Sequence, residues 1–217
     1  MGNRNLKEQV IEKCLFVCAA SSIAIVFLIF FMVVYIGYPI IADWLLNGFG
    51  MSWSPTSGKF GILPYMYSTL YVGIGATLIA TLLGLPCAIY LAEFANRKIR
   101  NIVKPSLEAL SGFPSVVMGL VGFALLLGII RTSFNVGSGY GVLAAWIVLG
   151  IMSLPHVASI AEDSIRAVPR ELREASLALG ATRWQTLLKV LIPGARPGII
   201  AAIVLAMGSA VGETMAA

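Results

Sequence analysis

The chain has few charged residues. Asp, Glu, Lys and Arg make up 12% of its 217 residues, about half the share of roughly 25% that is usual in soluble domains. The charges are absent in blocks, because none of these four residue types occurs in residues 15–42, 60–92, 109–130, 132–161 or 197–212. This composition excludes an ordinary soluble domain.

Histidine and cysteine are scarce as well. The chain has one histidine, His156, and three cysteines, Cys14, Cys18 and Cys87. There is no C-x-x-C motif, so we expect the cysteines to be small buried apolar residues. No G-x-x-x-x-G-K-[ST] phosphate loop occurs, and no nucleophile or metal-ligand pattern surrounds His156. We therefore predict that the chain is not an enzyme, binds no metal, and takes the energy for any active work from a partner.

The apolar blocks predict membrane-spanning helices. A bilayer core of about 30 Å is crossed by roughly 20 residues of helix, and four of the five blocks are that long. We predict an all-α, polytopic transmembrane helical bundle with spans near residues 15–36, 65–92, 110–130, 141–161 and 198–217.

The first span reads as an uncleaved anchor. Its apolar core is longer than the ~7–15 residues of a signal peptide, and no obvious small-x-small cleavage site follows it. We expect residues 1–59 to comprise an N-terminal cytoplasmic segment, this anchor helix and a short external loop. Residues 60–217 are expected to form the helical core.

The basic residues predict the orientation. Thirteen of the 15 lie in the N-terminal segment and in residues 93–108 and 162–196, whereas Lys59 and Arg131 lie in the two alternate segments. Basic residues are retained on the cytoplasmic side of membrane proteins, so the N-terminus and both of these loops are expected there. The alternative, a basic face for nucleic acid, does not explain why the charges alternate with the spans.

Residues 174–193, EASLALGATRWQTLLKVLIP, contain two short helix signals joined by a glycine. Leu172, Ala175 and Leu179 recur at helical spacing, and Gly180 favours the left-handed conformation that ends a helix. Thr182 followed by Gln185 matches a capping box.

The second of these helices is also amphipathic. Pro193 is predicted to end it, and its apolar face is predicted to contain Trp184, Leu187, Leu188 and Leu191. An amphipathic helical pair in a polar segment between spans needs a surface on which to dock.

The same segment resembles the EAA signature of ABC-importer permeases: Glu-Ala-Ala, three residues, Gly, nine residues, then I-x-L-P. The resemblance implies cytoplasmic coupling helices over about residues 164–192, which sit in a groove of a separate ATPase subunit. The implied coupling residues are Glu174, Ala175, Gly180, Trp184, Leu188 and Pro193. The alternatives are a helix pair lying on the membrane surface and a helix-turn-helix DNA reader, which the tether between two spans disfavours.

Three further segments resemble the permeases of phosphate importers: FGILPYMYSTL (60–70), GFPSVVMG (112–119) and GETMA (212–216). The last is closer to the C-type of the two permeases in that system. The resemblance implies a permease subunit for inorganic phosphate in the cell membrane. It implies as partners a second permease subunit, two ATP-binding subunits, an external substrate-binding protein and membrane lipid. ATP would be bound by the partners, and this chain would have no cofactor of its own.

Two other functions remain open at this stage. A permease for another oxyanion, such as molybdate or sulfate, would share most of these features. A channel or membrane sensor that needs no ATPase is the alternative from another class. Co-purification of an ATPase through residues 162–196 would separate the two classes.

Candidate residues of the translocation pathway lie at two places. Gly112, Pro114 and Ser115 interrupt the third predicted span, and broken helices can expose backbone groups to a cavity; a plain packing kink is the alternative. Glu213 and Thr214 lie in the GETMA motif, and a carboxylate deep in an apolar run usually faces a pathway or a partner.

The end of the chain departs from the resembling permeases. They usually carry an arginine where Ser209 stands, four residues before Glu213 and, in a helix, on the same face. They also continue beyond the helix in which this sequence ends, so we expect the helical core to be incomplete at its C-terminus. Gly208 and Gly212 form a G-x-x-x-G pattern, which most simply predicts a close helix contact.

Overall fold

The computed structural model describes residues 6–47, 50–57, 59–134 and 141–213. The chain divides into two compact units, Met1–Met66 and Tyr67–Ala217. The described residues are largely helical, and the sheet found among them has two short strands.

The first unit contains a long helix, α1 (Leu6–Asn47), of 42 residues. At 1.5 Å per residue it is about 63 Å long, and the predicted span 15–36 lies inside it. Between Val10 and Tyr38 its large apolar side chains are exposed on all sides within the unit, which is typical of a helix surrounded by lipid. Cys14 and Cys18 are exposed with them. Our expectation that these two cysteines are buried is wrong, since no described residue of the unit covers this part of α1.

A small hairpin follows α1. Strands β1 (Trp53–Ser54) and β2 (Lys59–Phe60) pair antiparallel, with Trp53 opposite Phe60, around the 3-10 turn η1 (Pro55–Ser57). The ring of Trp53 meets the ring of Tyr65 edge-on, with 5.0 Å between centroids. The hairpin is thereby fixed to the first turn of α2 (Leu63–Ile89).

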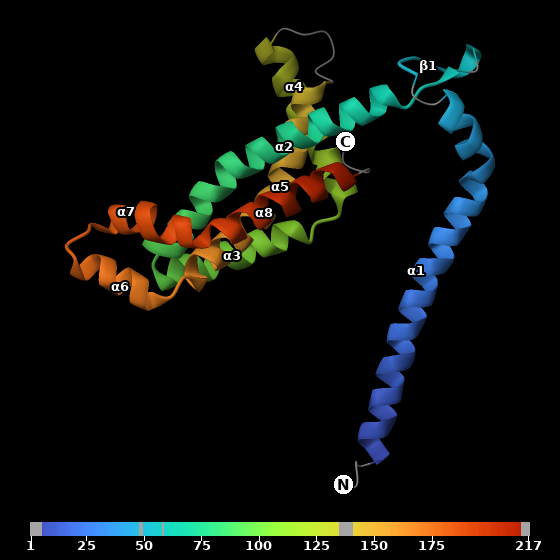
Figure 1. Ribbon diagram of the computed structural model, residues 1–217. Helices are drawn as coiled ribbons and strands as arrows, with labels where there is room; N and C mark the ends of the chain where they lie inside the picture. The colour runs from blue at the N-terminus through green and yellow to red at the C-terminus, as the bar shows by residue number, and fades with distance from the viewer. Residues whose placement is uncertain (1–5, 48–49, 58, 135–140, 214–217) are drawn as a thin grey trace. The chain divides into compact units, whose positions relative to one another are not determined.

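The second unit is a bundle of helices that starts within α2. After α2 the described elements are η2 (Tyr90–Phe94), α3 (Arg97–Ser111), α4 (Ser115–Phe134), α5 (Val142–Ala167), α6 (Arg170–Ala178), α7 (Arg183–Thr186), η3 (Leu187–Leu191) and α8 (Ile192–Gly212). In Figure 1, α8 lies beside α2, and the short helices α6 and α7 project from one end of the bundle. Both η2 and η3 are single π-helical turns that continue directly into or out of an α-helix.

Small residues dominate the core of this bundle. α5 and α8 lie close together, and a Cβ at Gly198 of α8 would overlap the hydroxyl of Ser164 of α5. Small side chains let helix backbones approach closely when the apolar surroundings give no hydrophobic driving force. The main cluster of buried residues is Ala88, Ala92, Ala161, Ile165, Leu187, Leu191, Ala195, Ile199 and Ala202.

Five helices are long and apolar enough to cross a membrane: Glu8–Tyr38, Leu63–Phe94, Ser115–Phe134, Val142–Ala167 and Arg183–Gly212. They confirm the predicted all-α polytopic class and the number of spans among the described residues. The third begins at Ser115, five residues later than predicted, because the chain breaks between α3 and α4.

Pro193 does not end a helix, and our prediction that it does is wrong. The chain continues from η3 into α8, and Pro193 lies in the first turn of that helix. At this position the missing N–H of proline and its fixed φ are tolerated. The segment that leads out of the coupling region is therefore continuous with the last described span.

α3 was not predicted as a helix from the sequence. Its start is capped by Asn96, whose side chain accepts a hydrogen bond from Ile99 N at 2.8 Å. It runs antiparallel along the end of α5 and turns away after Ser111. Most of the predicted loop 93–108 is thus part of a helix that packs against α5, and not a simple polar loop.

Candidate functional site

α6 and α7 form a helical hairpin that turns at Gly180, as predicted. Gly180 has φ of 82°, a conformation that costs residues with a side chain about 1–2 kcal/mol. Its N–H donates to Leu177 O, and Ala181 N–H donates to Ser176 O. This pair of bonds is the Schellman arrangement that ends a helix at a glycine.

The predicted capping box at the start of α7 is confirmed. Gln185 N–H donates to Thr182 Oγ1 at 3.2 Å, and Thr182 N–H donates to Gln185 Oε1 at 2.8 Å. The hydroxyls of Ser176 and Thr186 lie 2.9 Å apart, so α6 and α7 are also joined to one another. The hairpin is therefore a defined structure and not an irregular loop.

The outer side of the hairpin carries exposed apolar side chains. Leu179 is 89% exposed, Trp184 57% and Leu188 47%. Glu174 and Ala175 on α6 are exposed as well. We call these five residues the outer coupling surface. Four of them, Glu174, Ala175, Trp184 and Leu188, are among the six coupling residues that the EAA resemblance implies.

The inner side of the hairpin belongs to the core of the bundle. Leu187 and Leu191 are fully buried beside Ile165 of α5. We predicted them on one face with Trp184 and Leu188, and this is wrong. Leu187 and Leu191 lie on the side of the helix that packs against α5, and Trp184 and Leu188 lie on the adjoining side, so the apolar residues divide between the core and the outer coupling surface.

An ion pair joins the hairpin to the end of α2. Arg173 Nη2 of α6 lies 2.8 Å from Glu93 Oε2 of η2, and the Glu93 side chain is almost completely buried. η2 itself is held by the N–H of Ala95, which donates to Tyr90 O five residues back. The ion pair therefore joins α6 directly to the end of the helical segment that starts with α2.

A buried carboxylate on α5 is surrounded by cations. Glu162 is fully buried, with Lys104 Nζ 2.7 Å from Oε2 and Arg100 Nε 2.9 Å from Oε1. Arg166 Nε is more distant, at 3.5 Å from Oε1. Lys104 also contacts the exposed Asp163. This cluster fixes α3 against α5 at the same end of the bundle as the coupling hairpin.

The two carboxylates set the protonation of Lys104. Burial by itself lowers the pKa of Lys104, but hydrogen bonds to Asp163 and Glu162 together outweigh this effect, and the pKa is raised from its usual value of 10.5. Lys104 is therefore an ammonium at neutral pH.

The candidate pathway residues lie on separate elements. Gly112 and Pro114 are exposed at the break between α3 and α4, and Ser115 is half-buried at the first residue of α4. Glu213 follows the last residue of α8 with extended backbone, so our expectation that it shares a helical face with Ser209 is wrong. Thr214 lies outside the described residues.

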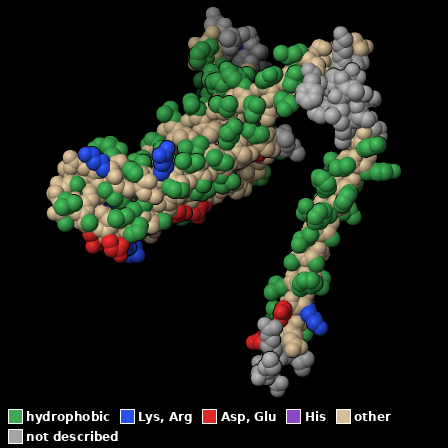
Figure 2. Space-filling view, viewed as in Figure 1, with side chains coloured by type: hydrophobic (Ala, Val, Ile, Leu, Met, Phe, Trp, Pro, Cys, Tyr) green, Lys and Arg blue, Asp and Glu red, His purple; other side chains and the backbone are tan. Residues whose placement is uncertain are grey.

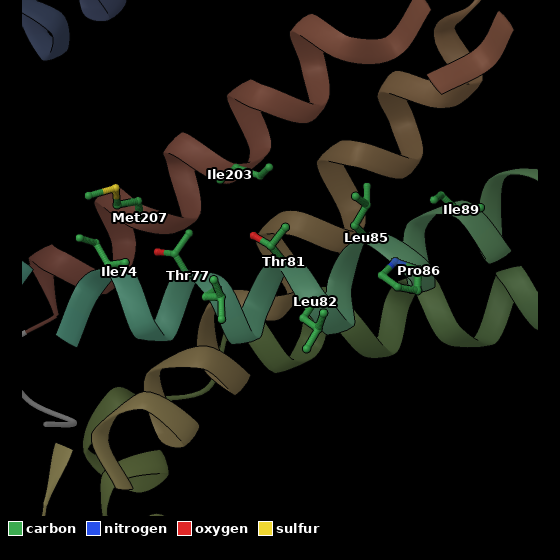
Figure 3. A pocket seen from close by; sticks show the side chains of 10 residues that line it. Ile74, Thr77, Thr81, Leu82, Leu85, Pro86, Ile89, Ile203 and Met207 are labelled. Carbon is green, nitrogen blue, oxygen red and sulfur yellow. The ribbon is translucent and has the colours of Figure 1, made fainter. Parts of the chain in front are cut away.

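A groove that the sequence did not predict runs between α2 and α8 (Figure 3). It has a volume of about 520 Å³, and Thr77 and Thr81 supply the hydroxyls in an otherwise apolar lining. Thr77 donates to Gly73 O at 2.7 Å. The hydroxyl of Thr81 is buried and has no hydrogen-bond partner among the described residues.

A family model described as "Binding-protein-dependent transport system inner membrane component" matches residues 84–217. This is well over half of the chain, and it includes the coupling hairpin, the α3–α4 break and all of α8. The chain belongs to this family. It is an ABC-importer permease, as the EAA segment predicted.

Two relatives place the permease more closely. It is 37% identical to the probable ABC transporter permease protein YqgH of Bacillus subtilis, over 99% of this chain and 71% of YqgH. It is 35% identical to the phosphate transport system permease protein PstC of Mesorhizobium japonicum, over 76% of this chain and 56% of PstC. The predicted resemblance to phosphate-importer permeases of the C-type is confirmed, and the chain spans little more than half the length of this PstC.

A solved structure supports the fold of the permease. The MetNI methionine ABC transporter in an inward-facing conformation matches with a TM-score of 0.60 and 25% identity, over 69% of this chain and 73% of that chain. The helical bundle described above is therefore that of an importer permease.

Some residues of the permease were missed by sequence reasoning. The two cations closest to Glu162, Arg100 and Lys104, come from α3. A sufficient signal for that helix was the apolar stripe after Asn96, at intervals of three and four residues: Ile99, Val103, Leu107 and Leu110. Glu162 was predicted only as a charged residue at the start of the loop 162–196. No pattern in a single sequence shows that a charged residue near the end of a span is buried.

Proposed function

We propose that this chain is a permease subunit of an ATP-driven importer for inorganic phosphate. It forms part of the translocation pathway and is driven by separate ATPase subunits. The 35% identity with the phosphate permease PstC over most of this chain supports phosphate as the substrate. The sequence has no G-x-x-x-x-G-K-[ST] phosphate loop, which supports a separate ATPase subunit. A second permease subunit and an external substrate-binding protein complete the transporter.

The outer coupling surface is the observation that carries this proposal. Leu179, Trp184 and Leu188 are exposed together on a short helical pair between two spans. Exposed apolar clusters on an otherwise polar surface mark sites of interaction. Figure 2 shows charged side chains around this end of the bundle, whereas most of the side chains visible along the bundle are apolar. The surface therefore fits a partner in water and not the lipid that surrounds the spans.

The hairpin is connected to the spans by three kinds of contact. Arg173 holds Glu93 at the end of α2, Leu187 and Leu191 pack against α5, and η3 leads without interruption into α8. A force applied to the outer coupling surface is thereby transmitted to α2, α5 and α8 together. ATP binding and hydrolysis in the partner would alternate these helices between outward-open and inward-open arrangements.

The chemistry of the pathway suits an anion that must not be trapped. Hydroxyl and backbone N–H groups bind an oxyanion without a permanent opposite charge. Ser115 begins α4, and Thr81, whose buried hydroxyl has no hydrogen-bond partner among the described residues, lines the α2–α8 groove. We assign both to the pathway. Glu213 would repel a phosphate ion, and we assign it a gating or orienting role.

The basic residues give the orientation of the proposed importer. The predicted cytoplasmic loops 93–108 and 162–196 lie at the same end of the bundle, where Glu93 meets Arg173 and Arg100 meets Glu162. We place this end in the cytoplasm, where the ATPase is, and the N-terminus with it.

The test is ATP hydrolysis by the complete transporter in liposomes. The full chain, its partner permease, the ATPase and the binding protein are reconstituted, and hydrolysis is measured with phosphate, sulfate or molybdate. Stimulation by phosphate alone supports the proposal. Stimulation by another oxyanion alone would contradict the substrate, and failure of any ATPase to bind the chain would contradict the class of transporter.

A variant tests the role of the outer coupling surface in the same assay. Leu179→Asp and Trp184→Asp place charge where a buried contact is expected, so ATPase binding should fall at least about tenfold, which corresponds to 1.4 kcal/mol. Phe134→Asp changes an exposed apolar residue at the far end of α4 and is the matched control for added charge. An equal loss of ATPase binding in all three variants would contradict the proposal that the ATPase binds at the outer coupling surface.

A further inference from the structure

A small cavity opens where α5 meets α6, beside the outer coupling surface. It has a volume of about 230 Å³. A tetrahedral oxyanion with its five heavy atoms fits this space. The cavity is lined by Ala92, Arg166, Val168, Arg170, Arg173 and Glu174.

Three guanidinium groups and one carboxylate give this lining an excess of positive charge. Glu93 compensates part of this charge through its ion pair with Arg173, whereas Glu162 is held more closely by Lys104 and Arg100 than by Arg166. Arg170 makes no hydrogen bond or ion pair with any described residue. Its charge is therefore available to a ligand.

Arginine suits one class of ligand in particular. The planar guanidinium presents a fork of donors that matches the oxygens of a phosphate group in two parallel hydrogen bonds. The three arginines outnumber the one glutamate in the lining. A neutral or cationic ligand would not compensate this excess positive charge, whereas an anion would.

We propose that this arginine cavity is a second anion site, which binds a phosphate group with Arg170 as its main ligand and Arg166 and Arg173 as its neighbours. The site lies on the surface of the bundle and not in the translocation pathway, and it does not depend on which substrate the permease carries. The phosphate group comes either from inorganic phosphate in solution or from the headgroup of an anionic lipid.

Occupation of the site bears on the coupling hairpin. Arg173 also holds Glu93, so an anion in the cavity competes with the ion pair between η2 and α6. Glu174 of the outer coupling surface lines the same cavity. The anion therefore changes the electrostatic environment at the root of the hairpin.

The test uses phenylglyoxal, which modifies accessible arginines, with each modified peptide measured by mass spectrometry. The full chain is placed in phosphatidylcholine nanodiscs, in phosphate or in chloride at the same ionic strength. With phosphate at ten times its Kd, modification of Arg170 should fall about tenfold by mass action. Arg183 at the far end of the hairpin is exposed and serves as the internal control.

A second arm separates the two sources of the phosphate group. Nanodiscs with phosphatidylglycerol are compared in chloride alone. Protection of Arg170 there assigns the site to a lipid headgroup, and protection by phosphate in phosphatidylcholine assigns it to the free ion. Equal modification of Arg170 in every medium, or equal protection of Arg183, would overturn the site.

Arg170→Gln tests the assignment of the ligand. Because Arg170 is exposed and unpaired in the described structure, this variant should fold normally, and it should abolish the protection of Arg166 and Arg173 by phosphate. Unchanged protection of these two arginines would contradict the proposal. Protection of Arg170 by the ATPase subunit without phosphate would instead assign the arginines to a subunit interface, and the proposal would be wrong. A transporter that fails to carry phosphate, by contrast, would contradict only the proposed function.

Discussion

The ammonium of Lys104 lies 2.7 Å from Oε2 of the fully buried Glu162, so α3 is fixed to α5 through a charge that solvent does not reach. Arg100 completes the pairing from the next turn of α3. A buried carboxylate of this kind is stable only while its cations are in place. The position of the α3–α4 break relative to α5 therefore depends on these side chains.

Replacement of Glu162 tests this dependence. Glu162→Gln leaves Arg100 and Lys104 without their buried, charged partner. It should lower the free energy of unfolding by up to about 3 kcal/mol, which is the lower end of the range for breaking a buried ion pair. The lower end applies because both cations are partly exposed to solvent. Asp163→Asn alters an exposed carboxylate of the same cluster and should cost less than about 1 kcal/mol. Thermal unfolding of the two purified variants in detergent is the measurement. Equal costs would mean that burial of Glu162 has no energetic consequence.

The raised pKa of Lys104 predicts how this contact responds to pH. A cation with a raised folded-state pKa stabilises the fold fully below its unfolded value of 10.5, and the stabilisation is lost as pH rises through the folded value. The difference in melting temperature between the wild type and Lys104→Gln should thus be constant from pH 7 to about 10 and shrink above it. A difference that already shrinks between pH 7 and 9 would show that the carboxylates do not raise this pKa.

The turn of the coupling hairpin is tested by two substitutions at Gly180. Valine strains the backbone at φ of 82° by about 1–2 kcal/mol, whereas asparagine adopts this region more readily. Gly180→Val should weaken ATPase binding and reduce the phosphate transported per ATP hydrolysed, and Gly180→Asn should change both much less. Both variants should insert normally in the membrane. Transport by Gly180→Val at the wild-type rate would show that the hairpin does not couple.

The ion pair between α6 and η2 allows a charge exchange. Arg173→Glu places a second carboxylate beside the nearly buried Glu93, and it should uncouple ATP hydrolysis from transport. The double variant Glu93→Arg/Arg173→Glu restores opposite charges and should recover part of the coupling, with an interaction energy of about 0.5–3 kcal/mol. If the effects of the two single changes are additive, the ion pair does not contribute to the coupling of ATP hydrolysis to transport.

The orientation is tested by cysteine labelling in a chain without its three native cysteines. Met51→Cys and Lys98→Cys are suitable because both side chains are exposed and neither takes part in the ion pairs of the described residues. A membrane-impermeant maleimide should label residue 51 in intact cells and residue 98 only after the membrane is opened. Labelling of residue 98 from outside would reverse the topology and place the hairpin away from the ATPase.

The features of the fold that local sequence determines were predicted well. The charge-free blocks predicted the spans. Gly180 predicted the turn of the hairpin, and Thr182 and Gln185 predicted the capping box. Each of these features depends on residues close together in the chain. Three features were not predicted: the burial of Glu162, the exposure of Trp184 beside the buried Leu187, and the position of Thr81 in the α2–α8 groove. They depend on contacts between distant elements, which no local pattern reports.

The π-helical turn η3 has a consequence for how this protein is compared with its relatives. One additional residue in a continuous helix rotates every later side chain by about 100° around the axis, since an α-helix has 3.6 residues per turn. If a relative that lacks the extra residue is aligned without a gap, core positions of this protein are therefore matched to surface positions of the relative from Ile192 onward. A single-residue gap within residues 187–191 restores the correspondence, and where an alignment places that gap shows whether a relative keeps the same division between core and outer coupling surface.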